Sequence, residues 1–328
     1  MQDVMEKIKA RIAELLQNGS VDRVLAWKKG ETFYDHSPAV FSADDSIDDL
    51  VYDSFSVANL SKYLIRETEK EGKIAVLLKP CDTYGFNQLL TEHRIHRDRV
   101  YVIGIPCRGK IDMNKVKENG VRVPLSLTEE EDVLHFETLN GSKTIDRNAV
   151  KYDKCLSCKG KKHMAYDELI EEDGEVNAET TRFDMVEKLE AMSSDERYAF
   201  WRNEFSKCIR CYACRNVCPA CSCKTCIFDN PVSGVANKAN SDASEENMYH
   251  IIRAFHVAGR CTDCGECSRV CPQGIPLHLL NRKFILDINR LYGEYQAGEE
   301  AMSRSPLIDY RKDDAEPSIV SQRGGEQK

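Results

Sequence analysis

Two runs of cysteine constrain the fold of this chain more than any other feature. The first run is Cys208, Cys211, Cys214 and Cys218, and the second is Cys261, Cys264, Cys267 and Cys271. Both read C-x2-C-x2-C-x3-C-P, which is the ligand pattern of a bacterial-type [4Fe–4S] cluster. Three thiolates on one short loop can reach three corners of a cubane cluster, so the fourth corner needs a ligand from elsewhere in the chain.

We therefore predict two clusters that exchange their fourth ligands, as in two-cluster ferredoxins. The first would use Cys208, Cys211, Cys214 and Cys271; the second would use Cys261, Cys264, Cys267 and Cys218. Zinc sites and disulfides are the two other interpretations of grouped cysteines. Zinc favours two C-x2-C pairs around one ion, and disulfides belong to small secreted chains; neither matches a doubled four-cysteine run.

Bulk properties exclude several classes of protein. A chain of 328 residues, 41% hydrophobic and 30% charged, is expected to form two soluble domains. It contains no apolar run of transmembrane length. A net charge of −8 argues against general nucleic-acid binding. The first nine residues are charged and resemble no signal peptide, so fifteen cysteines indicate a reducing, anaerobic cytoplasm.

The N-terminal part is predicted to be an α/β domain, residues 1–165, with a mixed or parallel sheet. Apolar spacing predicts helices over 3–17, 46–71 and 83–93, and buried strands over 74–78 and 100–105. A strand, a helix and a second strand of these lengths indicate parallel pairing through a right-handed crossover. Weaker strands are expected over 110–150, with a hairpin turn at Asn140-Gly141.

The C-terminal part is predicted to be a mostly helical domain with two [4Fe–4S] clusters, residues 196–300. An acidic linker over 166–195 would precede it, and a polar, disordered tail over 301–328 would follow it. A capping box at Ser193–Glu196 opens one helix. A second is expected over 245–258, with an apolar face at Met248, Ile251, Ile252 and Phe255, and a third from beyond Cys271 to about residue 297.

Four further cysteines lie in the N-terminal part. Cys81 and Cys107 each follow a predicted strand, where open α/β sheets place their ligands, and Cys155 and Cys158 form a C-x2-C pair. Buried free cysteines are common as small hydrophobic residues. A C-x2-C pair in a reducing cell, however, favours a metal or redox task, so a third [4Fe–4S] cluster is our preferred interpretation.

Other features leave alternatives open. Lysines and one histidine surround the C-x2-C pair, either as a solvated loop or as charges that tune a cluster: Lys151, Lys154, Lys159, Lys161, Lys162 and His163. Cys221, Cys223 and Cys226 either bind a metal with one outside ligand or remain unliganded thiols. No Gly-rich nucleotide motif occurs, the histidines are dispersed, and no catalytic residue is predicted.

With these motifs in place, the chain resembles the beta subunits of deazaflavin-reducing hydrogenases and the matching formate dehydrogenases. The resemblance rests on KPCD at residues 79–82, GIPCRG at 104–109 and CLSC at 155–158, and covers roughly residues 20–295. The pairing with a dicluster module is similar to beta subunits of sulfhydrogenase and anaerobic sulfite reductase.

The resemblance implies an electron-relay subunit of an anaerobic multi-subunit oxidoreductase. Its partners would be a flavoprotein, a hydrogenase, a formate dehydrogenase or a heterodisulfide-reductase-like subunit. Deazaflavin-linked members also hold FAD beside the N-terminal cluster, but no residue here can be matched to flavin contacts. The alternative is a flavin-bearing subunit that itself reduces a nicotinamide, a deazaflavin or a sulfur compound near Cys81 and Cys107; a zinc scaffold is a third interpretation.

Overall fold

The computed structural model describes residues 2–160, 162–174, 181–230, 232–233 and 243–309. The chain divides into two compact units. The first consists of Met1–Thr83 and Ile95–Arg182, and the second of Tyr84–Arg94 and Phe183–Lys328. Within the described ranges, no helix is both long and apolar enough to span a membrane.

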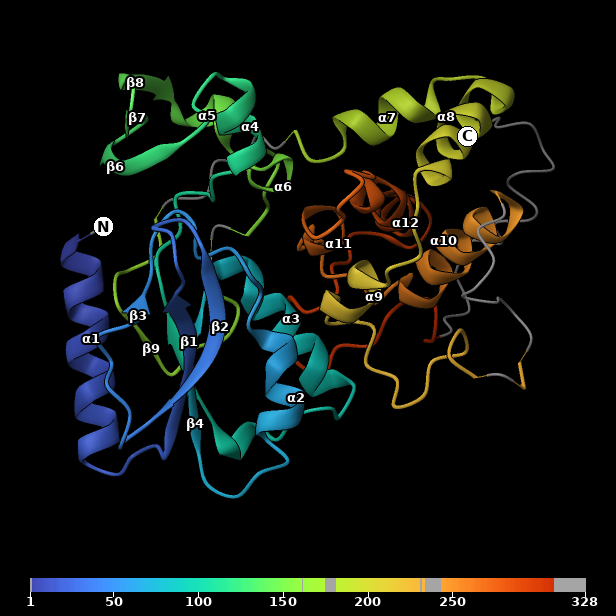
Figure 1. Ribbon diagram of the computed structural model, residues 1–328. Helices are drawn as coiled ribbons and strands as arrows, with labels where there is room; N and C mark the ends of the chain where they lie inside the picture. The colour runs from blue at the N-terminus through green and yellow to red at the C-terminus, as the bar shows by residue number, and fades with distance from the viewer. Residues whose placement is uncertain (1, 161, 175–180, 231, 234–242, 310–328) are drawn as a thin grey trace. The chain divides into compact units, whose positions relative to one another are not determined.

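The first unit is built on a mixed sheet in the order β2-β1-β4-β5-β9, with β3 also paired to β1 (Figure 1). The strands are β1 (Arg23–Lys29), β2 (His36–Ser42), β3 (Leu50–Val51), β4 (Ile74–Leu78), β5 (Val100–Gly104) and β9 (Glu168–Leu169). β4 pairs in parallel with β1 and β5, and β5 with β9, whereas β2 and β3 are antiparallel to β1. The predicted α/β class and the parallel strand–helix–strand unit are confirmed.

Helices cover this sheet. Helix α1 (Gln2–Gln17) lies along one side and α2 (Leu64–Glu67) along the other (Figure 1). α1 turns Ile8, Ile12 and Leu15 into the core, as its spacing predicted. All five residues of β4 are buried, which is typical of a central parallel strand covered on both faces. Helix α3 (Pro80–Thr91) follows β4 directly, and a 3₁₀ turn over Arg97–Arg99 precedes β5.

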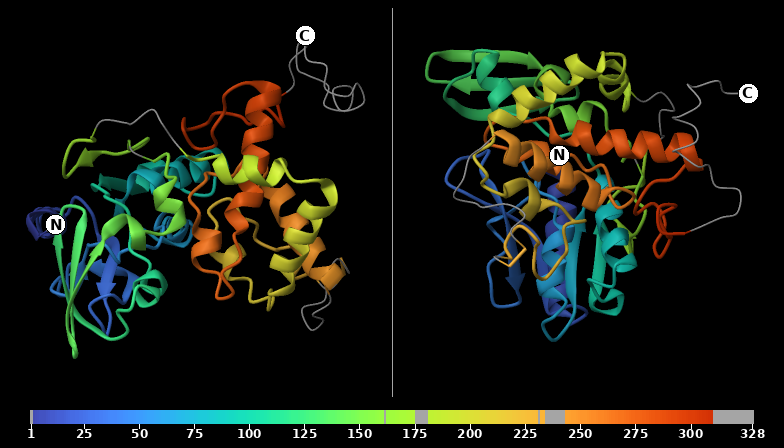
Figure 2. Two further views of the ribbon diagram at one scale, coloured as in Figure 1. Left: turned by 90° about the horizontal axis from the view of Figure 1, so that it is seen from above. Right: turned by 90° about the vertical axis from the view of Figure 1, so that its right-hand side faces the viewer.

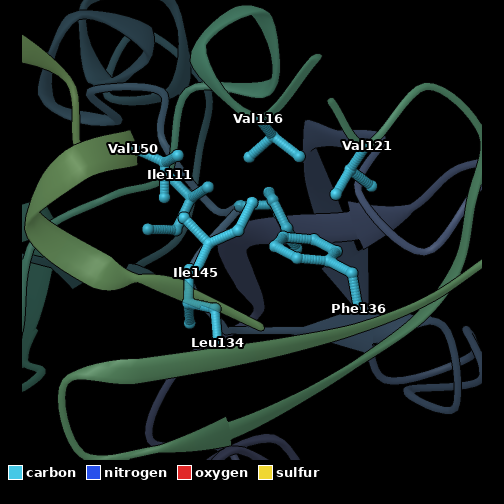
Figure 3. Close-up of a cluster of buried hydrophobic side chains, with 8 residues drawn as sticks. Ile111, Val116, Val121, Leu134, Phe136, Ile145 and Val150 are labelled. Carbon is cyan, nitrogen blue, oxygen red and sulfur yellow. The ribbon is translucent and has the colours of Figure 1, made fainter. Parts of the chain in front are cut away.

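A second, three-stranded antiparallel sheet completes the first unit. It comprises β6 (Pro124–Glu130), β7 (Val133–Thr138) and β8 (Gly141–Asp146), with Thr138 opposite Gly141. The predicted hairpin at Asn140-Gly141 is confirmed. The inner face packs on α4 (Met113–Glu118), on residues before and after it, and on α5 (Arg147–Val150). Figure 3 shows the resulting cluster, in which Leu134 and Phe136 point toward Ile111 and Val116.

The helix predicted over 46–71 is wrong. Only a 3₁₀ turn (Ser61–Tyr63) and the short α2 are helical there, and Leu50–Val51 is a strand. Short polar side chains cap the local backbone instead: Asp53 accepts from the Phe55 N–H at 2.7 Å, and Asn59 from the Ser61 N–H at 2.9 Å. Such bonds compete with the helical ladder.

The interval 166–195 is not a plain linker. β9 pairs with β5, and α7 (Asp184–Glu190) packs on α12 (Leu277–Tyr292). The acidic β9 is tied to its own unit because Glu168 accepts from Arg11 Nε at 2.8 Å and from the Tyr101 hydroxyl at 3.1 Å. Residues 175–180, in the same interval, lie outside the described residues.

The described regular elements of the second unit are helices joined by loops (Figures 1 and 2). Besides α7, α12 and the part of α3 from Tyr84 onward, they are α8 (Ser194–Ser206), α9 (Ala213–Val217), α10 (Ala243–Val257) and α11 (Glu266–Arg269). α8 begins with the predicted capping box, in which Ser193 accepts from the Glu196 N–H. α12 ends at Tyr292, earlier than predicted, because Gly293 takes a left-handed φ of 88°.

Two further expectations meet different outcomes. The apolar face predicted for α10 is largely exposed, with Met248 at 50% and Phe255 at 62%. The buried face of α10 instead carries Glu246, Tyr249, His250 and Arg253, which therefore require an explanation. Of the tail predicted to be disordered, residues 301–309 form turns in which Ser305 is buried, and the rest lies outside the described residues.

Candidate metal centres

The two C-terminal cysteine runs adopt the same backbone conformation. Arg210 and Asp263, each two residues after the first cysteine, both have φ of 51°. Tyr212 and Gly265, directly after the second cysteine, have φ of 61° and 66°, and each precedes a short helix, α9 or α11. Left-handed φ in a non-glycine residue costs about 1–3 kcal/mol and persists only where the surroundings fix it. Both loops are therefore shaped around a common requirement.

An ion pair holds the strained residue of each loop, with the charges reversed. In the first loop, Arg210 Nε donates to Glu246 of α10 at 2.9 Å, and both side chains are at most 4% exposed. In the second loop, Asp263 accepts from Arg282 Nε of α12 at 2.7 Å, and both are at most 3% exposed. The clamps differ in sign while the backbone they fix is the same, so the clamp serves loop shape rather than loop charge.

The structure brings cysteines from one run next to the other. Burial raises the pKa of Cys214, and the negative charges of Cys271 and Cys211 raise it further. Burial likewise raises the pKa of Cys261 and of Cys267 to about 12, with an added contribution from Cys218. Cys271 thus lies beside the first loop and Cys218 beside the second, while Cys208 and Cys264 lie within their own loops.

These pKa shifts have a chemical meaning. A buried thiol that ionises only near pH 12 is a poor free thiolate, because nothing in its apolar surroundings compensates the charge. A metal that replaces the proton removes this penalty. The donor set, grouped thiols in largely buried positions, fits iron–sulfur clusters.

Several polar groups of the helices face the sulfur atoms. The Arg210 backbone N–H donates to Cys208 Sγ at 3.3 Å. The Tyr249 hydroxyl lies 3.7 Å from Cys214 Sγ, and Asn281 Nδ2 of α12 donates to Cys267 Sγ at 3.8 Å. Hydrogen bonds to cluster sulfurs stabilise the anionic form and tune its potential.

Two buried polar side chains of α10, beside these cysteines, would fit an anionic group. His250 stacks on Phe205 with ring centroids 4.6 Å apart, and neither of its ring nitrogens has a hydrogen-bond partner among the described residues. Burial, with Arg253 and Arg210 nearby, lowers the pKa of His250 to about 3, so it is neutral. Arg253 is likewise buried, and its guanidinium has no hydrogen-bond partner within the described ranges.

The spacing of the buried polar residues of α10 could have identified them from the sequence, although composition and cysteine spacing do not. Glu246, Tyr249, His250 and Arg253 follow the spacing i, i+3, i+4, i+7, which places polar groups on one face of a helix. Opposite them runs the apolar stripe that we expected to be buried. A ring nitrogen of His250, a carboxylate oxygen of Glu246 and the sulfur of Cys208 lie within 4.8 Å of one another. The Glu246 carboxylate, however, is already bonded to Arg210.

In the first unit, the structure gathers the four other cysteines predicted as ligands. Cys81 lies in the first turn of α3, Cys107 follows β5, and Cys155 lies in the short helix α6 (Asp153–Leu156), with Cys158 beyond it. Burial raises the pKa of Cys81 well above its ordinary value, with contributions from Asp82 and Cys158. Burial also raises the pKa of Cys155, with a contribution from Cys107.

Glycine 160 makes the approach of these segments possible. A Cβ added at Gly160 would lie 2.8 Å from the Cα of Cys81 and 2.9 Å from its Cβ, closer than real Cβ atoms come. The Gly160 N–H also donates to Cys158 Sγ at 3.3 Å. This glycine therefore brings the Cys158 loop against the start of α3.

Buried lysines surround the same cysteines. Lys79 pairs with Asp82 at 2.7 Å and lies 4.3 Å from the Trp27 ring centroid. Lys110 lies 3.9 Å from the Tyr52 ring centroid, and its backbone N–H donates to Cys155 Sγ at 3.4 Å. Burial lowers the pKa of Lys110 to about 8. Neither lysine was singled out from the sequence; only their positions next to Cys81 and Cys107 could have indicated them.

The charged cluster noted around the C-x2-C pair has mixed roles. Lys154 lowers the pKa of Cys81 and Cys155 against the larger effect of burial. His163 is buried and bonded to Asp173 at 2.6 Å, and Lys151 bonds Asn148 at 2.8 Å. Lys161 lies outside the described residues. Lys154 therefore fits a role in tuning the charge at these cysteines, whereas His163 and Lys151 have structural partners.

The three remaining cysteines lie close to arginines. Cys221 and Cys223 interact electrostatically with Arg260, and Arg215 bonds Cys226. Arg260 itself pairs with Glu92 at 2.7 Å. Cys221, Cys223 and Cys226 thus face guanidinium groups, and neither of the two interpretations given for them is tested by this arrangement.

Comparison with known proteins completes the description of the site. Residues 204–275, which contain both cysteine runs, match the family model "4Fe-4S dicluster domain". The chain is 26% identical to the F420-dependent formate dehydrogenase subunit beta of Methanocaldococcus jannaschii, over 85% of this chain and 88% of that protein. The predicted family resemblance is confirmed.

Two further proteins show similarity to this chain. The F420-dependent formate dehydrogenase 1 subunit beta of Methanococcus maripaludis is 26% identical over 65% of this chain and 71% of its own length. A chain of the F420-reducing [NiFe] hydrogenase complex from Methanosarcina barkeri aligns with a TM-score of 0.37 and 14% identity, over 50% of this chain and 63% of that one. The prediction of an iron–sulfur electron-transfer subunit is confirmed by the dicluster domain and the beta-subunit relatives.

Proposed function

We propose that this chain relays electrons through three [4Fe–4S] clusters within an anaerobic, cytoplasmic, multi-subunit oxidoreductase. The observation that carries the proposal is the pair of cysteine loops with equal backbone conformation, each with the last cysteine of the other run beside it. One cluster would be bound by Cys208, Cys211, Cys214 and Cys271. The next would be bound by Cys261, Cys264, Cys267 and Cys218.

The third cluster would be held by Cys81, Cys107, Cys155 and Cys158 in the first unit. Its support is the convergence of strand ends and the C-x2-C turn, together with the close approach of Gly160 to Cys81. Lys79, Lys110 and Lys154 would offset the negative charge that four thiolates bring to a buried place. The first domain would then carry one redox centre, and a mostly helical dicluster domain over about residues 196–300 the other two.

The chemistry divides simply between the cofactors and the chain. A bound [4Fe–4S] cluster takes up and releases single electrons at a potential set by its charge, hydrogen bonds and exposure. The chain supplies thiolate ligands, buries them, and aims N–H groups such as those of Arg210 and Gly160 at their sulfurs. No side chain in this scheme transfers a proton to a substrate, so catalysis would belong to a partner subunit.

The partner would be a flavoprotein, a hydrogenase, a formate dehydrogenase or a heterodisulfide-reductase-like subunit. This part of the proposal comes from the relatives, which are named as beta subunits of F420-dependent formate dehydrogenases. The same names favour one alternative, in which this chain binds a flavin and itself reduces a deazaflavin near Cys81 and Cys107.

One cavity beside Cys107 bears on that alternative. It has a volume of about 190 Å³ and is lined by Asp3, Glu171, Arg108, Pro106 and Val4. Ligand pockets are typically about 300–1,000 Å³, and two carboxylates repel the diphosphate of a dinucleotide. This cavity is therefore a poor site for FAD.

Iron content tests the proposal site by site. Cys211→Ser and Cys155→Ser are each expected to lose about four irons from a total of about twelve, because each would break a different four-iron cluster. Cys223→Ser is the matched control, an exposed cysteine outside the ligand sets, and should keep the full iron content. Iron and sulfide are measured on anaerobically purified chain. Unchanged iron in the Cys211 variant would overturn the dicluster assignment, and unchanged iron in the Cys155 variant would remove the third cluster.

A further inference from the structure

Arg253 stands apart from the other buried arginines of the second unit. Its side chain is 2% exposed in the interior of α10, and none of its three guanidinium nitrogens has a hydrogen-bond partner among the described residues. By contrast, Arg210 pairs with Glu246, and Arg282 with Asp263. A guanidinium buried without a counter-charge is strongly unfavourable.

The negative groups near Arg253 are thiols. Its strongest electrostatic neighbours are Cys267, Cys214 and Cys218. Cys214 is an expected ligand of the first cluster, and Cys267 and Cys218 are expected ligands of the second. Cys214 and Cys267 are also the two cysteines of the runs with buried side chains, at 7% and 6% exposure.

Neighbouring contacts fix the direction of this face. Tyr249, one turn before Arg253 on the same side of α10, places its hydroxyl 3.7 Å from Cys214 Sγ. From α12, Asn281 approaches Cys267 Sγ at 3.8 Å. The face of α10 that carries Arg253 is therefore turned toward sulfur. Among the described residues, no carboxylate bonds the guanidinium of Arg253.

We propose that Arg253 is a cation shared by both clusters of the dicluster domain, which donates N–H groups toward their sulfurs and raises both reduction potentials. The inference rests on the proposed function, since it needs the two clusters. When either cluster gains an electron from the redox partner, its negative charge grows by one, and the guanidinium lies close enough to stabilise the added charge. No bond to Arg253 forms or breaks, and the guanidinium stays protonated.

A shared cation has a specific consequence. Arg210 and Asn281 each approach one loop, so their loss should affect one cluster more than the other. Loss of Arg253 should lower the potentials of both clusters together. Arg253 would thereby raise the potentials of the pair as a unit and leave the difference between them largely unchanged.

The test is a reductive titration of the anaerobic full-length chain, followed by EPR. Arg253→Met and Arg253→Gln remove the charge, Arg253→Lys keeps it, and Arg290→Met, an exposed arginine of α12, is the control for the same change of net charge. In both neutral variants we expect the ratio of reduced to oxidised cluster at the wild-type midpoint to fall about tenfold for both clusters, which corresponds to 59 mV. Arg253→Lys should recover most of this shift, and Arg290→Met should show none.

The outcomes separate this inference from the proposed function. Wild-type chain without iron or an EPR signal would overturn the proposed function and the inference together. Full iron with unchanged potentials in the neutral variants, or a shift confined to one cluster, would overturn the shared cation alone. If both neutral variants lose iron, Arg253→Lys decides: full iron with near-wild-type potentials supports the cation, whereas loss of iron in that variant too reduces Arg253 to a packing role.

Discussion

The cysteines of the first unit and those of the two C-terminal loops, residues 208–218 and 261–271, are brought together by different means. These two loops share one backbone conformation and are called the twin loops below. Cys81, Cys107, Cys155 and Cys158 come from separate elements, and the ends of β4 and β5 position the first two. In the twin loops the ligands are close in sequence, and the local backbone holds strained conformations at Arg210, Tyr212 and Asp263. The four cysteines of the first unit are positioned by a fold that has a hydrophobic core of its own. The cysteines of the twin loops are instead part of the hydrophobic core of the second unit.

The packing of the second unit makes the same point. Its apolar cluster includes the buried Cys214 and Cys267, with Phe205, Tyr249 and Leu277 packed around them. Half-buried cysteines, Cys208, Cys226 and Cys271, lie at its edge. In the first unit, the cluster of Figure 3 contains aliphatic and aromatic residues alone. Loss of clusters should therefore unfold the second unit far more than the first.

The largest effect follows from removing iron. After chelation under anaerobic, reducing conditions, hydrogen exchange should become fast over residues 208–218 and 261–271, since metal binding there is coupled to folding. Amides of β4 and β5 should stay protected, because all residues of β4 and most of β5 are buried in the sheet. Mass spectrometry of exchange on the same sample measures both. Equal loss of protection in the two units would break the comparison.

A smaller effect is expected from unbalancing one loop clamp. Glu246→Gln removes the buried carboxylate that accepts from Arg210 Nε and leaves this guanidinium with Glu245 alone among the described carboxylates, at 3.5 Å. Breaking a buried ion pair typically costs about 3–5 kcal/mol, and the remaining pair sets this as the upper limit. The second unit should lose stability by this order in anaerobic urea unfolding, while the first unit is unaffected. Glu187→Gln, which breaks an exposed pair with Arg290, is the matched control and should cost about 1 kcal/mol or less. Similar losses in the two variants would show that the clamp does not hold the loop.

The smallest effect concerns the helix that leads into the first loop. Ser193→Ala removes the cap of α8 and should cost about 1 kcal/mol of the second unit's stability. Hydrogen bonds from Ser193 lower the pKa of Glu196. The capping box with ionised Glu196 thus contributes fully to the stability of the second unit at pH values above the ordinary pKa of glutamate. This contribution is lost as the pH falls through the lowered pKa of Glu196. Circular dichroism of the variant across this pH range should show a smaller acid transition; an unchanged profile would contradict the cap.

Some of this structure follows directly from sequence. Continuous apolar runs predicted β4 and β5, because a strand buried on both faces needs apolar residues throughout. The regular spacing of Ile8, Ile12 and Leu15 predicted α1. The cysteine runs predicted the centres because the spacing of the ligands is itself the chemical requirement.

Two of the failures have a common physical cause. β9 and the buried face of α10 are polar in sequence, and tertiary partners decide their place. Glu168 is held by Arg11 and Tyr101, and Glu246 by Arg210. Arg253 is buried beside thiols that lie in other segments of the chain. A hydrophobicity pattern puts such residues at the surface, and only the charges brought from elsewhere reverse that placement.

The most direct test of the central claim is the iron and acid-labile sulfide content of the untreated wild-type chain, purified without oxygen, with zinc measured on the same sample. Three cubane clusters require about twelve irons and about twelve sulfides per chain. About eight irons would leave the first unit without a cluster. That result would contradict the comparison between a cluster positioned by the fold of the first unit and clusters positioned by the loops of the second. A chain that contains zinc in place of iron would contradict the account as a whole.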